Sequence, residues 1–479
     1  AVPYLIQMTY VPVLALGGER ALTLWTTLGG WMPAAGLYVL CRPHLSRNGS
    51  LAAALVFLTL PVVAFSGSSG QVELRAALFV IVAAWAAARA LRTGEMRYAL
   101  LAGIAVGFYG GAKYVGLLFA LACGLVLLAQ RRRFPAGFLY SLAALAAGFQ
   151  WYLWNGLNTG DPFFPLLFEW LGKDDLSQWT LEQNRLVGAI LAHYEQSVPR
   201  AFLGFFRYPF HATLDPAPVI DAQRAGLGPF GLLVLPFALL GAWRFRRRIP
   251  QSPLGVYAAL AFLFYVGWFV GAPSQRVRHL LPVMPLLMVC FTVAARRFAD
   301  TAGARGALLG AFALTLAFQF AGQGLVSAKY VRYFTQGRDR EAFLNAAISH
   351  YAPVPWLNAH LGPGDKLLIE ERQLLYFLKM PHFFASAHGQ SAINLWPGKT
   401  DVSTLSAQIR AQGVTHILLR SMPGGKEYGD PYDPLRRAGC LVRIKRFSTV
   451  RIVSRTLSAK TGGEDTFDLV RLRDGGCKG

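Results

Sequence analysis

Apolar runs close to the length of a bilayer crossing recur along the chain up to residue 325. A membrane-spanning helix needs roughly 17–25 apolar residues, and several of the runs reach that length. Together with a mean hydropathy of +0.37, the pattern predicts an all-α polytopic membrane domain of about ten spans. The runs cover residues 20–41, 51–66, 72–92, 98–111, 114–130, 135–154, 228–243, 254–271, 278–296 and 305–325.

Arginines gather after every second run. If each run crosses the bilayer once, all these clusters lie on one face, and an excess of Lys and Arg marks that face as cytoplasmic. The same clusters account for the net charge of +22 without a nucleic-acid partner, because the basic residues are not interleaved with aromatic ones. The clusters consist of Arg42, Arg47, Arg89, Arg92, Arg97, Arg131, Arg132, Arg133, Arg244, Arg246, Arg247, Arg248, Arg296, Arg297 and Arg305.

Lys113 is the only charged side chain between Tyr98 and Gln130. As one helix, 98–130 would be about 50 Å long, which exceeds a hydrocarbon core of roughly 30 Å. Gly110 and Gly111 are the expected break between two short spans. This break would place Lys113 at the outer mouth of a hairpin rather than at mid-membrane.

The long apolar runs end, and the pattern of the sequence changes, near residue 328. Short β-like runs, such as "THILLRS", "LVRIKRF", "FDLVRLR" and "KLLIEERQLLYFL", alternate with helical stretches at 340–350 and 403–412. We expect a transmembrane domain over 1–327 and a soluble, extracytoplasmic α/β domain over 328–479. Two cysteines of this second part, Cys440 and Cys477, could pair if it lies outside the cytoplasm.

The connection 155–227 is expected to be a long outer loop rich in aromatic residues and proline. Two interpretations are open. Its apolar clusters could form short amphipathic helices that lie along the membrane surface. Alternatively, the loop is a packed lid that does not contact a substrate.

The same count of spans gathers charged residues at the outer face. A carboxylate such as Glu73 can act as a general base or bind a divalent cation. Lysine and arginine can hold a phosphate group, and Lys113, Arg276 and Arg278 are the candidates for this role. Such a site, open to the outer leaflet, suits a substrate with a phosphate and a lipid tail.

Each of these residues also has a structural explanation. Glu73 could pair with Arg75, Lys113 could extend along a helix end to the interface, and Arg276 and Arg278 could anchor a span. His279 is expected to be structural rather than a ligand.

Four stretches, taken together, resemble the GT-C superfamily of integral-membrane glycosyltransferases. The similar members are bacterial enzymes related to the protein mannosyltransferases and to the aminoarabinose transferase of lipid A. The stretches are "QVELRAALF", "GIAVGFYGGAKYVGLL", "WYLWNGLNTGDPFFPLL" and "RVRHLLPVMPLL". In the last of them His279 stands where the family usually has tyrosine.

The resemblance implies a bacterial inner-membrane enzyme that takes a sugar from a polyprenyl-phosphate carrier at the outer face. The acceptor would be a lipid, a glycan or a protein, and membrane lipids would surround the site. Glu73 would be the acidic residue that assists catalysis, with or without a divalent cation. Lys113 and Arg278 would stabilise the lipid phosphate.

The resemblance departs from the family at the start of the chain. The family's main catalytic aspartate lies in the first outer loop, and "AVPYLIQMTYVPVLAL" resembles the segment after that loop. A fragment, an incorrect start or an inactive protein would each explain this, and we favour a fragment.

Two other classes of function compete with the glycosyltransferase. A transporter or flippase of lipid-linked saccharides should show interrupted helices in two related halves, and the sequence has no such repeat. A non-catalytic membrane scaffold would agree with the absent aspartate but leaves the clustered outer charges without a role.

Overall fold

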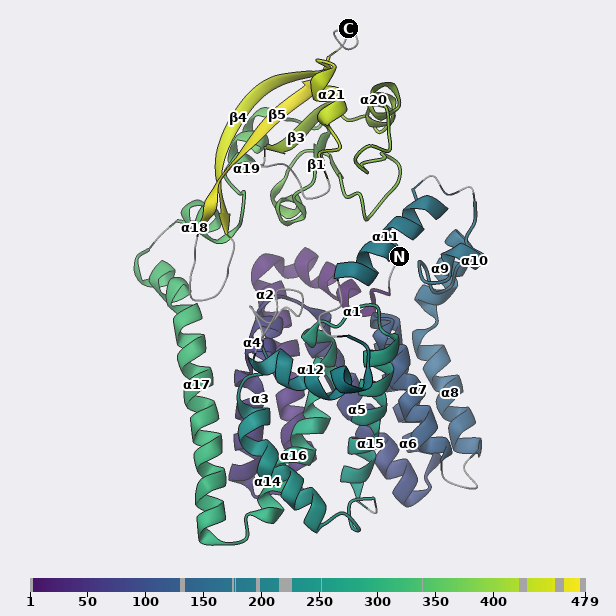
Figure 1. Cartoon of the computed structure of the whole chain (residues 1–479), viewed down its shortest axis with the longest axis vertical. Helices are drawn as coiled ribbons and strands as arrows, with labels where there is room; N and C mark the ends of the chain where they lie inside the picture. Colours follow the sequence, from purple (N-terminus) through teal and green to yellow (C-terminus); the bar gives the residue numbers. More distant parts are fainter. Residues whose placement is uncertain are drawn as a thin grey trace. The chain divides into compact units, whose positions relative to one another are not determined.

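The computed structural model describes residues 3–129, 134–174, 176, 178–194, 199–214, 226–250, 252–337, 339–421, 429–452 and 461–473. Its internal contacts divide the chain into two compact units (Figure 1). The first unit comprises Ala1–Lys173 and Gly188–Leu325, and the second comprises Asp174–Val187 and Val326–Gly479.

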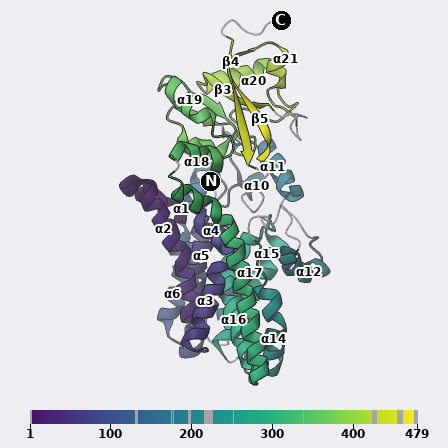
Figure 2. The same ribbon diagram turned by 90° about the vertical axis from the view of Figure 1, so that its left-hand side faces the viewer.

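The first unit is helical, and its long helices run alongside one another (Figures 1 and 2). The ten predicted apolar runs fall in these helices. The helices are α1 Leu5–Met8, α2 Tyr10–Cys41, α3 Arg47–Thr59, α4 Pro61–Ser68, α5 Val72–Thr93, α6 Met96–Ala112, α7 Val115–Leu128, α8 Phe134–Gly148, α9 Gln150–Thr159, α10 Phe168–Leu171, α12 Phe202–Leu214, α14 Phe230–Arg244, α15 Pro253–Gly271, the 3-10 helix η2 Val277–Val283 and α16 Met284–Phe298. Two further helices, α11 Leu181–Tyr194 and α17 Ala302–Thr335, belong to this unit only in part.

Within the described residues, four helical segments are long and apolar enough to cross a membrane, or five if one bent pair is a single span. The chain is therefore an integral membrane protein, although this criterion does not reach the predicted ten spans. Several apolar runs are broken: Pro61 follows an extended Leu60 and separates α3 from α4 by a bend of 69°, as expected for the residue before proline. The four segments are Val72–Thr93, Pro253–Gly271, Val277–Phe298 and Ala302–Leu325.

The predicted break between 98–111 and 114–130 exists, but its position was wrong. Gly110 and Gly111 remain inside α6, and the chain leaves the helix at Lys113, whose backbone is extended. The glycines instead allow close packing. A Cβ on Gly103 would lie 2.3 Å from the carbonyl oxygen of Tyr140, so α6 and α8 touch backbone to backbone.

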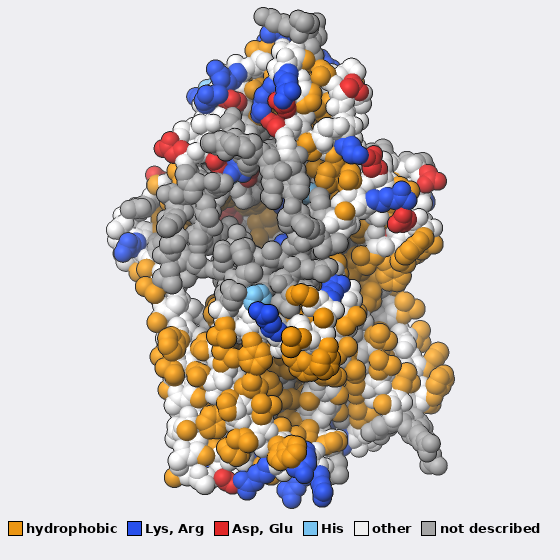
Figure 3. All heavy atoms as spheres, viewed as in Figure 1, with side chains coloured by type: hydrophobic (Ala, Val, Ile, Leu, Met, Phe, Trp, Pro, Cys, Tyr) orange, Lys and Arg blue, Asp and Glu red, His pale blue; other side chains and the backbone are white. Residues whose placement is uncertain are grey.

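The described arginine clusters lie at one end of this unit, where Figure 3 shows Lys and Arg side chains gathered below an apolar surface. α2 and α5 run in the same direction, because Gly29 lies against Arg75 and Gly36 against Ile81. Arg42 and Arg92 therefore follow at the same end. Arg244 pairs with Asp300 there, at 2.6 Å. The cluster at 131–133 lies outside the described residues.

The second unit carries a five-stranded sheet in the order β2-β1-β3-β5-β4. β1, β2 and β3 are parallel, whereas β5 pairs antiparallel with both β3 and β4. This sheet agrees with the expected α/β class. Its elements are α18 Arg340–Ala347, α19 Pro353–His360, β1 Leu367–Ile369, the 3-10 helix η3 Arg372–Phe377, β2 His382–Phe384, α20 Val402–Ala411, β3 His416–Ser421, α21 Asp433–Arg437, β4 Leu441–Ile452 and β5 Thr461–Leu472.

Part of the long connection 155–227 belongs to this second unit. The backbone N–H of Ser391 donates to the carbonyl oxygen of Gln178 at 2.9 Å. The indole of Trp396 donates to Gln183 Oε1 at 2.7 Å. The remainder includes α12, which exposes Phe202, Leu203 and other large apolar side chains, as an amphipathic surface helix would.

Cys440 is disulfide-bonded, whereas Cys41, Cys123 and Cys290 are free thiols. Cys477, its predicted partner, lies outside the described residues.

Candidate functional site

A buried carboxylate and an ammonium group form the centre of the candidate site. Glu73 lies in the first turn of α5, where the helix dipole favours a negative charge. Its side chain is only 6% exposed. Lys113 follows the last residue of α6, and its Nζ donates a hydrogen bond to Glu73 Oε1. The two helices therefore bring opposite charges together at one end of the bundle.

A third segment completes the cluster from far along the sequence. The 3-10 helix η2 begins at Val277, and Arg278 Nε lies 3.4 Å from Glu73 Oε1. His279 Nε2 lies 3.9 Å from the same oxygen. The structure thus brings Glu73, Lys113 and Arg278 into one cluster.

Arg276, the remaining predicted residue, precedes η2 as its N-cap residue and is half-buried. Its carbonyl oxygen accepts a hydrogen bond from the backbone N–H of His279 at 3.0 Å. Its backbone is therefore part of the turn that presents Arg278 and His279 to Glu73.

Arg75 is not the ion-pair partner of Glu73. Its guanidinium donates to the carbonyl oxygen of Thr26 at 2.7 Å and to that of Gln71, and it lies over the ring of Tyr10. Arg75 therefore ties α5 to α2, and the carboxylate of Glu73 is left to Lys113 and Arg278. The sequence already indicated that Glu73 and Arg75 do not pair, because residues two apart on a helix do not face each other.

The stretch "WNGLNTGDPFFP" builds a second layer behind Lys113, a role that the sequence analysis missed. The Tyr114 hydroxyl donates to the carbonyl oxygen of Phe164 at 2.6 Å and accepts from Asn155 Nδ2 at 3.1 Å. Asp161 accepts from the backbone N–H of Phe163 at 2.7 Å, as in an Asx turn. The available signal was the Asn and Asp-Pro turn chemistry of the stretch.

The charges of the cluster suit an anionic ligand. One carboxylate faces an ammonium and a guanidinium, so the positive charge of Lys113 and Arg278 exceeds the negative charge of Glu73. Guanidinium and ammonium groups are the usual protein ligands of phosphate.

A divalent cation at Glu73 fits these surroundings poorly. The described residues contain no group of three His, Cys, Asp or Glu side chains that could hold a metal ion. Glu73 Oε1 already faces two cationic side chains, which repel a metal. The divalent cation at Glu73 stays an untested prediction.

Comparison with known protein families bears on what this cluster does. Residues 2–154 match the family of dolichyl-phosphate-mannose-protein mannosyltransferases. This match confirms the resemblance to GT-C glycosyltransferases. The matched part of the chain holds Glu73 and Lys113, and it ends at Trp154, the first residue of the stretch behind Lys113.

Three solved structures of an oligosaccharyltransferase from Archaeoglobus fulgidus are also similar. The apo form shares 14% identity with a TM-score of 0.43 and covers 87% of this chain and 61% of that one. A form tethered to an acceptor peptide shares 12% identity with a TM-score of 0.43, and the match covers 87% of this chain and 60% of that one. The complex with an inhibitory peptide and a dolichol-phosphate shares 12% identity with a TM-score of 0.40, and the match covers 87% of this chain and 61% of that one. The chain thus spans about three fifths of their length. No curated protein sequence matches the chain.

Proposed function

We propose that this membrane protein transfers a sugar from a polyprenyl-phosphate carrier to a lipid, glycan or protein acceptor at the outer face of a bacterial inner membrane. The observation that carries the proposal is the meeting of Glu73, Lys113 and Arg278 at one end of the helical bundle. The family match over residues 2–154 supports the same class of reaction.

In this proposal, Lys113 and Arg278 bind the phosphate of the donor. The phosphate takes over the two cations that Glu73 holds in the structure described above. The carboxylate Oε1 is then free to accept a proton. Electrostatic stabilisation of a leaving group by preplaced cations is a large catalytic contribution.

The transfer step is an inverting displacement. The acceptor oxygen or nitrogen forms a bond to the anomeric carbon while the bond from that carbon to the phosphate oxygen breaks. The electron pair of the broken bond stays on the phosphate, where Lys113 and Arg278 offset its charge. The acceptor proton passes to Glu73, which acts as the general base.

The proposed topology places the arginine-rich end in the cytoplasm and the Glu73 end outside, with about ten crossings that include shorter and broken helices. The second unit would then be extracytoplasmic. A disulfide-bonded Cys440 supports this assignment, because disulfides persist in oxidising compartments.

The test mixes the purified chain with a set of polyprenyl-phosphate hexoses and with candidate lipid, glycan and peptide acceptors. It measures both release of polyprenyl phosphate and binding of added polyprenyl phosphate. We expect Glu73→Gln to lose release but retain binding, and Lys113→Ala to lose both. Arg92→Gln, at the opposite end of α5, is the matched control and should behave as the parent chain. Release that persists in both site variants would refute the assignment of the site.

The competing functions give different results in the same material. A flippase would move the intact lipid-linked sugar across a proteoliposome without releasing polyprenyl phosphate. A scaffold would neither release nor bind it.

A further inference from the structure

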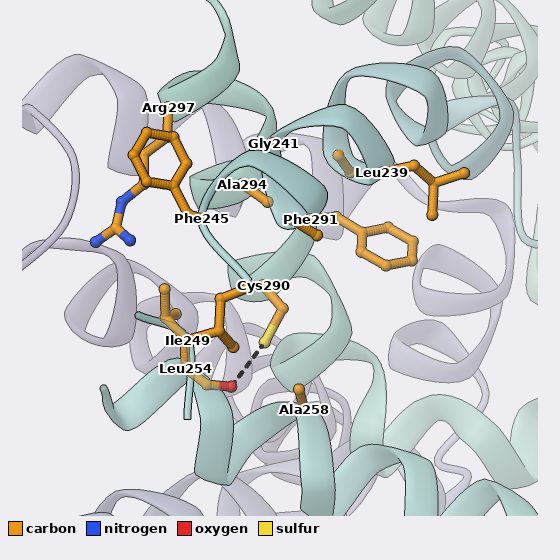
Figure 4. Close-up of a pocket in the computed structure, with 12 residues that line it drawn as sticks. Leu239, Gly241, Phe245, Ile249, Leu254, Ala258, Cys290, Phe291, Ala294 and Arg297 are labelled. Atoms are coloured by element: carbon orange, nitrogen blue, oxygen red, sulfur yellow. Dashed lines mark hydrogen bonds between the residues drawn. The ribbon is translucent and has the colours of Figure 1, made fainter. Parts of the chain in front are cut away.

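An apolar pocket lies at the arginine-rich end of the first unit, far from Glu73 along the helices. It is enclosed by α14, α15 and α16 and by the turn that joins α14 to α15 (Figure 4). Arg297 is the only charged residue among those that line it. The apolar lining includes Leu239, Phe245, Ile249, Leu254, Ala258 and Phe291.

Close packing of α14 against α16 borders one side of the pocket. A Cβ on Gly241 would lie 2.0 Å from the carbonyl oxygen of Ala294, so α14 and α16 are in backbone contact there. Phe245, at the end of α14, and Ile249, in the turn that follows, line the pocket next to this contact. The Sγ of Cys290 approaches the carbonyl oxygen of Leu254 at 3.6 Å and closes the inner side.

Part of the pocket lining is exposed on the apolar surface of the helical unit. Leu239, which lines it, is 59% exposed, and its neighbour Trp243 is 69% exposed. Helices that are apolar all round expose such side chains to hydrocarbon rather than to water. An acyl chain can therefore enter from the side without crossing a polar barrier.

A cation without an acidic partner lines the pocket. The guanidinium of Arg297 lies 5.8 Å from the centre of the Phe245 ring. Across the part of the chain that the structure describes, Arg297 forms no ion pair. Arg244, by contrast, pairs with Asp300 at 2.6 Å. Arg244 also lies 5.8 Å from the centre of the Phe245 ring, so the two arginines differ there in their acidic partner and not in their distance from the ring.

We propose that an anionic phospholipid of the surrounding leaflet binds here, with one acyl chain in the pocket and its phosphate on Arg297. The apolar lining would bind the acyl chain, and the unpaired guanidinium selects a negative headgroup. Free phosphate gains nothing from the apolar walls. A zwitterionic lipid gains less from the arginine than an anionic one, because its own ammonium group offsets the charge of its phosphate. The site is separate from the donor site and does not depend on the proposed transfer reaction.

The experiment is native mass spectrometry of the full chain released from detergent with added phosphatidylglycerol or phosphatidylcholine. We expect phosphatidylglycerol to bind more tightly, and Arg297→Gln to weaken its binding by about fivefold, the effect of one arginine near an anionic lipid. Arg297→Lys should retain most of the binding. Arg92→Gln, an exposed arginine at the same end, is the charge control.

A second pair of variants tests the cavity independently of charge. Ala258→Phe fills the pocket and should reduce phosphatidylglycerol binding, whereas Ala259→Phe, one residue along α15 and outside the lining, should not. Glycerol 3-phosphate at millimolar concentration should fail to displace the lipid, because it lacks the chain.

Three results would overturn the proposal. One is equal binding of the two lipids to the parent chain. Another is an equal loss in Arg92→Gln and Arg297→Gln, which would indicate a diffuse basic surface. The third is displacement by glycerol 3-phosphate, which would indicate a simple phosphate site.

Discussion

The hydroxyl of Tyr114 donates a hydrogen bond of 2.6 Å to the carbonyl oxygen of Phe164 and thereby fixes the residue that follows Lys113. Loss of this bond should let the backbone at Lys113 shift and weaken its contact with Glu73. We expect Tyr114→Phe to raise the apparent KM for the lipid-linked donor several-fold with a smaller effect on kcat. Stability should fall by only about 1 kcal/mol.

The matched control is Tyr140→Phe, which removes a bond of the same length, 2.6 Å, to the carbonyl oxygen of Ala120. It should cost similar stability without changing KM. An equal rise in KM for both variants would show that the effect is general loosening of the fold.

The pair formed by Glu73 and Lys113 should behave as a coupled unit in thermal unfolding. Glu73→Gln or Lys113→Met alone leaves a partly buried charge without its partner, at a cost of about 2–3 kcal/mol. The double variant should lose less than the sum of the two. The exposed pair of Arg244 and Asp300 is the control, and its double-mutant cycle should give under about 1 kcal/mol. Additive losses at Glu73 and Lys113 would contradict the contact.

The second unit should lose stability on acidification through His416. Burial lowers the pKa of His416, an effect larger than the opposing one of Asp365, 3.5 Å away, and Arg471 also lowers it. Because the folded state disfavours the protonated ring, stability is full above the unfolded pKa of about 6.5 and declines as the pH falls below it. Hydrogen exchange of the β3 peptide in the full chain should therefore accelerate at pH 5.5 relative to pH 7.5.

The variant His416→Gln should not show this acceleration once intrinsic exchange rates are subtracted. A parent chain and variant that respond alike to pH would assign the acid sensitivity to other groups.

The proposed topology is testable with membrane-impermeant thiol reagents. A cysteine at position 92, at the arginine-rich end, should react only after the membrane is opened. A cysteine at position 362, in the second unit, should react in intact cells. The reverse pattern would invert the orientation and move Glu73 to the cytoplasmic side.

The meeting of Glu73, Lys113 and Arg278 could be predicted from the sequence because it follows from counting. Glu73 lies at the start of α5, Lys113 at the end of α6 and Arg278 at the start of the span that contains η2 and α16. When successive spans alternate in direction, these three positions fall at the same end of the bundle. The number and direction of the spans do not determine where each side chain points. Arg75 turns toward α2 because of the rotation of α5 and the close approach at Gly29.

The breaks in the apolar runs were harder to predict. Gly110 and Gly111 suggested a turn, yet both are helical, since small residues also serve close helix packing. The assignment of Asp174–Val187 to the second unit depends on tertiary contacts of Gln178 and Gln183, for which a local pattern gives no signal.

The backbone contact of Gly103 and Gly107 with α8 has a further consequence. Because backbone atoms of α6 and α8 touch at Gly103 and Gly107, α6 cannot shift along its axis relative to α8, and the Lys113 ammonium at its end keeps a fixed position. In the proposed reaction, donors with longer or shorter isoprenoid tails would therefore place their phosphate at the same position, and the surrounding lipid would accommodate the difference in tail length.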